Sequence, residues 1–99
     1  MKNQNGQIER LAEVLSSLVN FVPETSDDLD HWYDQAKCIL EDHELLRGAP
    51  HFLWHYLADA DIRIKDEAYA EMQNRRIDRV LQHLKRGAMP SDEDTYLEQ

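Results

Sequence analysis

Three polar side chains near the middle of the chain have the types and the spacing of metal ligands. His51, His55 and Asp59 follow one another at intervals of four residues, so a helix would place them on one face. Neutral imidazoles and a carboxylate at that spacing can ligate zinc or another divalent transition metal. A complete site needs at least one more ligand from the preceding segment, where the candidates are His31, His43 and Glu44.

The same three residues fit a simpler interpretation, the solvent-exposed stripe of a mostly buried helix. Asp59 would then pair with Arg63, four residues further on, and the histidines would be hydrogen-bonded or hydrated. The spacing is common in helices, and it lacks the His-Glu-x-x-His arrangement of zinc hydrolases. We therefore favour the exposed stripe and expect no cofactor, with binding of a metal such as zinc as the alternative.

Further carboxylates follow this stripe and could exchange protons. Asp59, Asp61 and Asp66 alternate with Arg63 and Lys65, and paired carboxylates perform acid–base chemistry when burial separates their pKa values. Acids and bases four residues apart also form ion pairs on helix surfaces, which is the interpretation we favour. With three glycines the chain has no phosphate-binding loop, and it has no nucleophile-elbow motif. We expect no enzymatic activity.

Apolar residues recur at intervals of three and four through most of the chain, which predicts an all-α fold. The periodic segments cover residues 5–22, 26–46, 50–64 and 66–86. They predict a small four-helix bundle, in which three long segments surround a central hydrophobic helix at residues 50–64. We expect a single helical domain over residues 1–90, and an acidic flexible tail over residues 91–99.

Two local patterns bear on how these helices begin and join. Thr25, with Asp28 three residues later, approximates a capping box for the second helix. Between Asp59 and Asp66 no glycine or proline interrupts the chain. However, the apolar stripe of residues 53–64 is out of phase with the stripe of residues 77–84. One helix over residues 50–86 would be about 55 Å long, which implies a dimer or an extended shape. We favour a break near Lys65 over this continuous helix.

Charge is distributed unevenly along the chain. Twenty acidic and eleven basic residues give a formal net charge of −9, which repels nucleic acid, so we expect no nucleic-acid binding. From Glu24 to Glu44 there are eight acids and one base, whereas from Arg75 to Arg86 there are five bases and one acid. This asymmetry predicts docking of the second helix on the fourth, within one chain or across a homodimer, or binding of a basic partner.

Aromatic residues cluster in the second and third helices. They are Trp32, Tyr33, Phe52, Trp54 and Tyr56. Because Phe52, Trp54 and Tyr56 cannot all point inward from one narrow stripe, some of them must be covered by another helix, a partner or a ligand. Interfaces favour tryptophan and tyrosine anchors, so we predict that some of the five aromatic residues form an interface.

The compartment follows from what the sequence lacks. No apolar run approaches the length needed to span a bilayer, so we expect no membrane association. The first residues contain no signal-peptide core, and Cys38 is a single cysteine that cannot form an internal disulfide. We expect a cytoplasmic protein.

Composition, charge and aromatic clustering together predict a small acidic protein–protein interaction module of the adaptor, regulator or inhibitor type, acting as a homodimer. The alternative is a helical protein that binds a metal or a small ligand through His51, His55 and Asp59. A third interpretation is that the dense acids of the second helix imitate nucleic-acid phosphates, by analogy with small acidic inhibitors.

Overall fold

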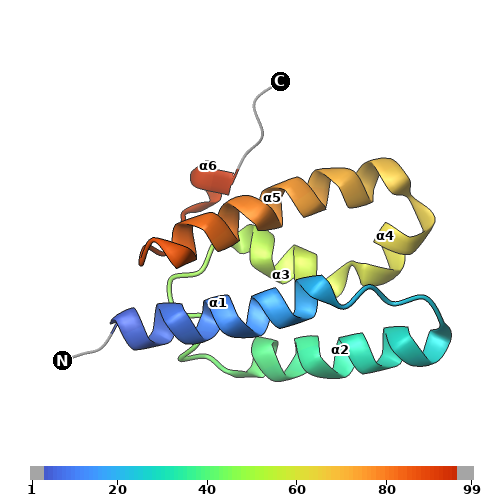
Figure 1. Cartoon of the computed structure of the whole chain (residues 1–99), viewed down its shortest axis with the longest axis horizontal. Coiled ribbons are helices and arrows are strands. Elements are labelled where there is room, and N and C mark those ends of the chain that lie inside the picture. Colours follow the sequence, from blue (N-terminus) through green and yellow to red (C-terminus); the bar gives the residue numbers. More distant parts are fainter. Residues whose placement is uncertain (1–3, 96–99) are drawn as a thin grey trace.

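A computed structural model describes residues 4–95 of the chain, and over these residues it contains α-helices and no strand (Figure 1). The helices are α1 (Gln4–Asn20), α2 (Ser26–Glu41), α3 (His51–Ala58), α4 (Ala60–Lys65), α5 (Glu67–Lys85) and α6 (Asp92–Thr95). The predicted all-α bundle is confirmed. The predicted division into four helices differs from the structure in three places, at residue 59, after residue 41 and after residue 91.

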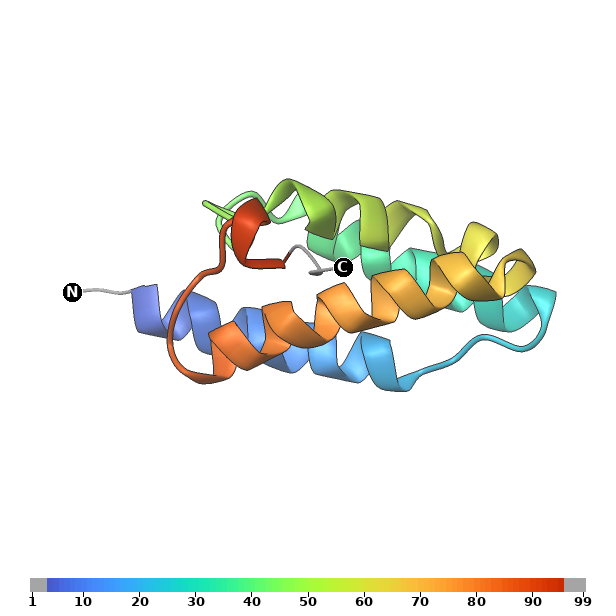
Figure 2. The same ribbon diagram turned by 90° about the horizontal axis from the view of Figure 1, so that it is seen from above.

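The longer elements form a bundle of four rods, in which α3 and α4 together make one rod. α1 packs against both α5 and α2, α3 packs against α2, and α4 packs against α5. Two views at right angles show α2 and α5 at opposite corners of this arrangement (Figures 1 and 2). The short connections predicted antiparallel neighbours, and α1 and α2 run in opposite directions.

The joint between the third and fourth predicted helices is broken near Lys65, as the phase of the apolar stripe predicted. α4 ends at Lys65, and Asp66 has extended backbone angles, φ −131° and ψ 102°. The Asp66 carboxylate then accepts a 3.0 Å hydrogen bond from the backbone N–H of Tyr69, which caps the start of α5. The continuous helix over residues 50–86 is therefore excluded.

A second interruption, at Asp59, divides the predicted helix of residues 50–64 into α3 and α4. The backbone of Asp59 has φ −109° and ψ 21°, outside the helical range. Its side chain is held by α5, because its Oδ2 accepts a 2.6 Å hydrogen bond from the hydroxyl of Tyr69. The interruption thus depends on a contact between distant residues, which local periodicity does not contain.

The second predicted helix, residues 26–46, is too long by one turn. α2 ends at Glu41, because the carboxylate of Asp42 accepts a 3.0 Å hydrogen bond from the N–H of Leu45 and turns the chain. Leu45 remains buried, which explains why its apolar character resembled a continuing helix. At its start α2 has the predicted capping box, since Thr25 and Asp28 each accept a hydrogen bond from the other's backbone N–H.

The prediction of a flexible tail over residues 91–99 is wrong for residues 92–95, which form α6. Residues 96–99 lie outside the described part of the chain. Asp92 accepts a 2.9 Å hydrogen bond from the N–H of Phe52, which anchors α6 at the start of α3. Arg76 of α5 donates to the carbonyl and to the hydroxyl of Thr95, whose side chain is fully buried. The guanidinium of Arg76 also lies 4.2 Å from the ring centroid of Phe52. This short helix therefore covers the first turn of α3.

The core is a single cluster of side chains contributed by α1, α2, α3 and α5. Its fully buried members include Leu11, Leu15, Leu18, Trp32, Leu53, Leu57, Ile77 and Val80. Burial of each aliphatic side chain of this size contributes about 1.5–3 kcal/mol. These contacts fix the positions of the helices that surround the candidate site.

The docking of α6 predicts a stability effect at Thr95. The substitution Thr95→Val keeps the shape of the side chain and removes the oxygen that accepts from Arg76. We expect the free energy of unfolding to fall by about 1–2 kcal/mol, because the partly buried guanidinium of Arg76 loses one of its acceptors and the carbonyl of Asp92 loses the hydroxyl of Thr95. Urea denaturation followed by tryptophan fluorescence measures the change. The matched control is Glu93→Gln on the exposed side of α6; equal stability of Thr95→Val and this control contradicts the docked helix.

Candidate functional site

The predicted His-His-Asp stripe is not assembled as a donor set. His51 and His55 are exposed on α3, and Asp59 lies partly buried at the break after α3. The Oδ2 atom of Asp59 accepts hydrogen bonds from the Tyr69 hydroxyl at 2.6 Å and from Nε2 of Gln73 at 3.4 Å. Among the residues that the structure describes, no three His, Cys, Asp or Glu side chains are grouped so that they could hold a metal ion.

The expected pairing of Asp59 with Arg63 is replaced by a different environment for Arg63. The guanidinium lies 4.0 Å from the ring centroid of Tyr56 and 5.1 Å from that of Trp32, which are cation–π distances. Its Nη1 donates to the carbonyl of Tyr56 at 2.7 Å and to Oε1 of Gln73 at 2.5 Å. Over residues 4–95 no ion pair to Arg63 is found, so aromatic faces and neutral oxygens compensate its charge.

A buried amide connects this cation to the carboxylate of Asp59. Gln73 of α5 is 1% exposed, and its amide oxygen accepts from Arg63. Its amide nitrogen donates to the hydroxyl of Tyr69 at 3.0 Å and to Asp59. Every polar atom of the Gln73 side chain therefore has a partner, as the energy of burying an amide requires. The network joins α4 and the break at Asp59 to α5.

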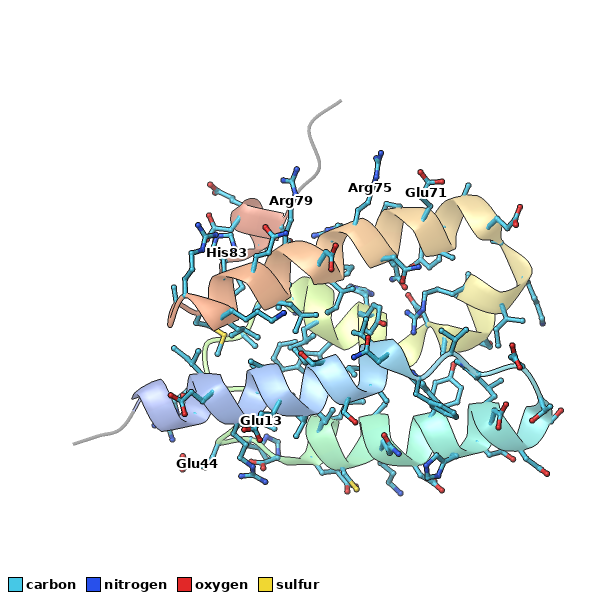
Figure 3. All side chains as sticks on the ribbon, viewed as in Figure 1. Glu13, Glu44, Glu71, Arg75, Arg79 and His83 are labelled. Atoms are coloured by element: carbon cyan, nitrogen blue, oxygen red, sulfur yellow. The ribbon has the colours of Figure 1, made fainter. Side chains whose placement is uncertain are left out.

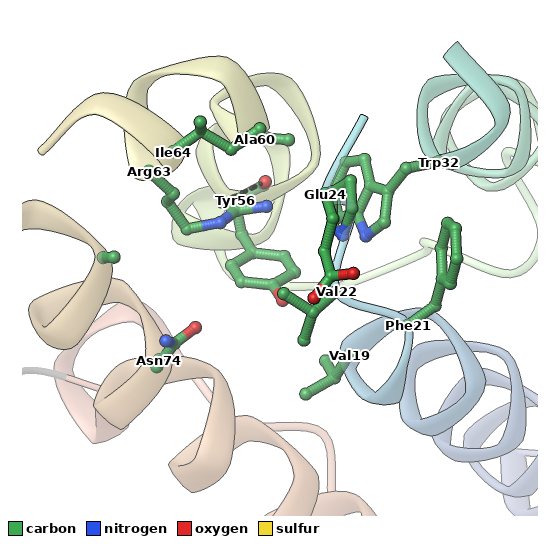
Figure 4. Close-up of a pocket in the computed structure, with 12 residues that line it drawn as sticks. Val19, Phe21, Val22, Glu24, Trp32, Tyr56, Ala60, Arg63, Ile64 and Asn74 are labelled. Carbon is green, nitrogen blue, oxygen red and sulfur yellow. Dashed lines mark hydrogen bonds between the residues drawn. The ribbon is translucent and has the colours of Figure 1, made fainter. Parts of the chain in front are cut away.

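A pocket with a volume of about 480 Å³ lies beside Arg63, where α4, α5, α2 and the end of α1 meet (Figure 4). Its walls are mainly apolar. They are formed by Val19, Phe21, Val22, Pro23, Glu24, Trp32, Tyr56, Ala60, Arg63, Ile64, Ala70 and Asn74. At the rim, Val22 is 71% exposed and Ile64 is 54% exposed. A concave apolar site with a few polar groups is the usual form of a ligand site.

Two polar groups face this pocket without a protein acceptor. Tyr56 is 3% exposed, and its hydroxyl makes no hydrogen bond within the described residues. Because no buried side-chain oxygen or nitrogen in that part of the chain lacks a partner, this hydroxyl must be accessible, and Figure 4 shows it directed toward Val22. The Nε and Nη2 atoms of Arg63 likewise have no hydrogen-bond acceptor among those residues. Tyr56 and Arg63 therefore each offer hydrogen-bond donors to the pocket, in addition to the exposed amide of Asn74.

Burial sets the protonation of both groups. It raises the pKa of Tyr56 above its ordinary value of 10.0, although the charge of Arg63 acts in the opposite direction. Burial also lowers the pKa of Arg63 from its ordinary value, against the influence of Tyr56, Tyr33 and Asp59. At neutral pH the pocket therefore contains a neutral phenol and a guanidinium cation.

The five predicted interface aromatics are placed in two different environments. Trp32, Phe52 and Tyr56 are at most 3% exposed, so within this chain they form core and pocket wall and are covered by other helices, one of the alternatives that the sequence left open. Tyr33 is partly buried and donates to Asp61 at 2.8 Å. Trp54 is 38% exposed on α3. Trp32, Phe52 and Tyr56 are covered by other helices of the chain. One of these helices, α6, lies in the segment that was expected to be a flexible tail.

Arg63 and Gln73 were not among the predicted site residues. Gln73 falls on the apolar stripe of α5, four residues before Ile77 and seven before Val80. A polar residue in such a stripe indicates a buried polar partner. That signal was present in the sequence, but the identity of the partner depends on how α4 and α5 meet.

The raised pKa of Tyr56 predicts a loss of stability at alkaline pH. Because the folded-state pKa exceeds the ordinary value of 10.0, the contribution of Tyr56 to stability is fully present below about pH 10 and is lost as pH rises through the folded pKa. Urea denaturation of the wild type and Tyr56→Phe between pH 8 and about 11.5 measures it. We expect the difference in free energy of unfolding to be constant up to about pH 10 and then to shift against the wild type; a constant difference throughout contradicts the burial of this phenol.

Within the described residues, no helix is both long enough and apolar enough to cross a membrane. Comparisons with family models, with curated proteins and with solved structures give no match for this chain. A function for this chain is therefore inferred from the geometry of the site itself.

Proposed function

We propose that this protein is a non-catalytic interaction module that binds a partner protein at the rim of the pocket beside Arg63. The observation that carries the proposal is the exposure of large apolar side chains at that rim, Val22 at 71% and Ile64 at 54%. Exposed apolar side chains around a concave surface are typical of interaction sites, because a partner removes them from water.

The charge around the pocket supports a basic partner. Glu24 lies at the mouth, and the acids of α2 continue from it, with Asp27 and Asp28 in the first turn. On the opposite side of the bundle, Arg75 and Arg79 of α5 point away from the core (Figure 3). Surfaces of opposite charge accelerate encounter and select partners. A partner that presents lysines or arginines beside an apolar group suits the acidic side.

The same separation of charge supports self-association between copies. Within one chain α2 and α5 occupy opposite corners, so the predicted docking of the acidic helix on the basic helix does not occur there. The acidic face of one molecule can meet the basic end of α5, including Lys85 and Arg86, of another. We therefore include a homodimer in the proposal.

A cytoplasmic location and the absence of metal chemistry complete the proposal. Cys38 is an exposed free thiol, which suits a reducing compartment. Metal binding through His51, His55 and Asp59, the alternative function, has less support, because Asp59 is already hydrogen-bonded to Tyr69 and Gln73. Nucleic acid is an unfavourable partner for a chain of net charge −9.

The rim residues provide the direct test of the interaction function. The double substitution Val22→Asp with Ile64→Asp places two charges where a partner would bury apolar groups. We expect the recovery of the partner, in affinity capture from extracts of the source cells, to fall by at least about tenfold, as for central interface residues. Quantitative mass spectrometry measures the recovery.

The matched control is Ile62→Asp, because Ile62 is 43% exposed on the same helix as Ile64 but does not line the pocket. We expect this variant to capture the partner as the wild type does. If the rim variant and the control recover the same proteins in the same amounts, the pocket rim is not the interaction surface and the proposal is wrong.

Self-association has its own test. Because complementary charges are screened within about 10 Å at 0.1 M salt, we expect a dimer at low ionic strength that dissociates as salt is added. Size-exclusion chromatography with light scattering measures the mass against the 11.7 kDa of one chain. A monomer at high protein concentration and low salt rules out the homodimer and leaves the binding of a different partner intact.

A further inference from the structure

We infer that the pocket beside Arg63 binds the C-terminal carboxylate of a partner chain whose last side chain is apolar. The inference rests on the proposed interaction function and names the group that the pocket receives. It depends on three properties of the pocket, namely its apolar walls, the donors of Tyr56 and Arg63, and the carboxylate of Glu24 among its lining residues.

The size and walls of the pocket suit one apolar side chain together with its backbone. The volume of about 480 Å³ lies within the range of pockets that enclose small ligands. Val19, Ala60 and Ile64 supply aliphatic wall, and the ring of Trp32 supplies an aromatic face. An aliphatic side chain that enters here is removed from water, which is the main favourable contribution to binding.

The accessible donors of Tyr56 and Arg63 can bind a ligand acceptor, and the charge of Arg63 favours an anion. The hydroxyl of Tyr56 and the Nε and Nη2 groups of Arg63 have no acceptor within residues 4–95, and Arg63 has no ion pair there. A carboxylate matches the planar fork of a guanidinium and accepts from a phenol at the same time. A phosphate dianion fits less well, because Arg63 is the single cation among the lining residues.

The mouth of the pocket favours a chain terminus over a free carboxylic acid. Glu24 is exposed there (Figure 4). Asp27 and Asp28 follow it along the chain, in the first turn of α2. A free carboxylic acid carries no positive charge that could offset its repulsion by this negative surface. A peptide with lysines before its last residue brings cations to Glu24 while its terminal carboxylate reaches Arg63. The charge of both groups is then satisfied by one ligand.

The two tryptophans of the chain provide the readout. Trp32 lines the pocket, whereas Trp54 lies on α3 outside it and is 38% exposed. The probe is an acetylated tetrapeptide of sequence lysine-glycine-lysine-leucine with a free carboxylate, titrated into the full chain and followed by the indole N–H signals in NMR spectra. We expect the Trp32 signal to shift and the Trp54 signal to stay. The C-terminal amide of the same peptide should bind at least about tenfold more weakly.

The substitution Tyr56→Phe tests the donor without removing the ring that packs on Arg63. We expect it to weaken binding of the free-carboxylate peptide by roughly tenfold, the effect of one hydrogen bond to a charged group. Tyr33→Phe is the matched control, because the hydroxyl of Tyr33 is bonded to Asp61 and Ala58 outside the pocket. Its affinity for the peptide should equal that of the wild type, and circular dichroism confirms that both variants are folded.

Three results overturn the inference. Equal binding of the amide and the acid excludes recognition of the carboxylate, and an unmoved Trp32 signal at millimolar peptide excludes the site. Hexanoate that binds as tightly as the peptide shows that the pocket holds a free carboxylic acid, not a chain terminus. The capture experiment with the Val22 and Ile64 variants is read independently, so the interaction function can stand when the carboxylate inference fails.

Discussion

A guanidinium taken partly out of water needs hydrogen-bond acceptors and polarisable faces around it, and this requirement links four helices at Arg63. The tryptophan ring comes from α2, the tyrosine ring and carbonyl from α3, the cation from α4, and the glutamine oxygen from α5. If any of these helices moved, a buried polar group would lose a partner, at a cost of about 1–3 kcal/mol. The same cluster forms one wall of the pocket. The interaction that positions the helices is therefore also the one that gives the pocket its charge.

The architecture could be predicted from the sequence as far as it depends on local pattern. The periods of three and four predicted the helices, and the capping box at Thr25 is confirmed. The break near Lys65 followed from a change of phase, which needs no knowledge of tertiary contacts. The break at Asp59 and the helix at residues 92–95 did not, because each depends on a distant residue, Tyr69 for the first and Arg76 for the second. A stretch of nine residues that includes four acids resembles a solvated tail until the surface that receives it is known.

The candidate site shows the same contrast between features set by local pattern and features set by contacts between distant residues. The His-His-Asp spacing was genuine, yet a shared helix face does not bring ligands together, and α3 ends before Asp59. Trp32 and Tyr56 of the aromatic cluster line the pocket, but the burial of each ring depended on which helix covered it. Arg63 was expected in a surface pair, because pairing rules consider neighbours on one helix only. Its actual partners lie seven and ten residues away along the chain, beyond the reach of such rules.

The shortness of α4 has a consequence for motion. A helix of six residues is far below the length at which helices are stable in isolation, so α4 is held by its side-chain contacts. Asp59 and Asp66, at its two ends, separate it from α3 and α5, so it can unfold locally while its neighbours keep their backbone hydrogen bonds. Such sub-global opening requires less free energy than unfolding of the whole bundle. The wall that carries Arg63 and Ile64 is thus the part of the bundle that a bound ligand would protect most from hydrogen exchange.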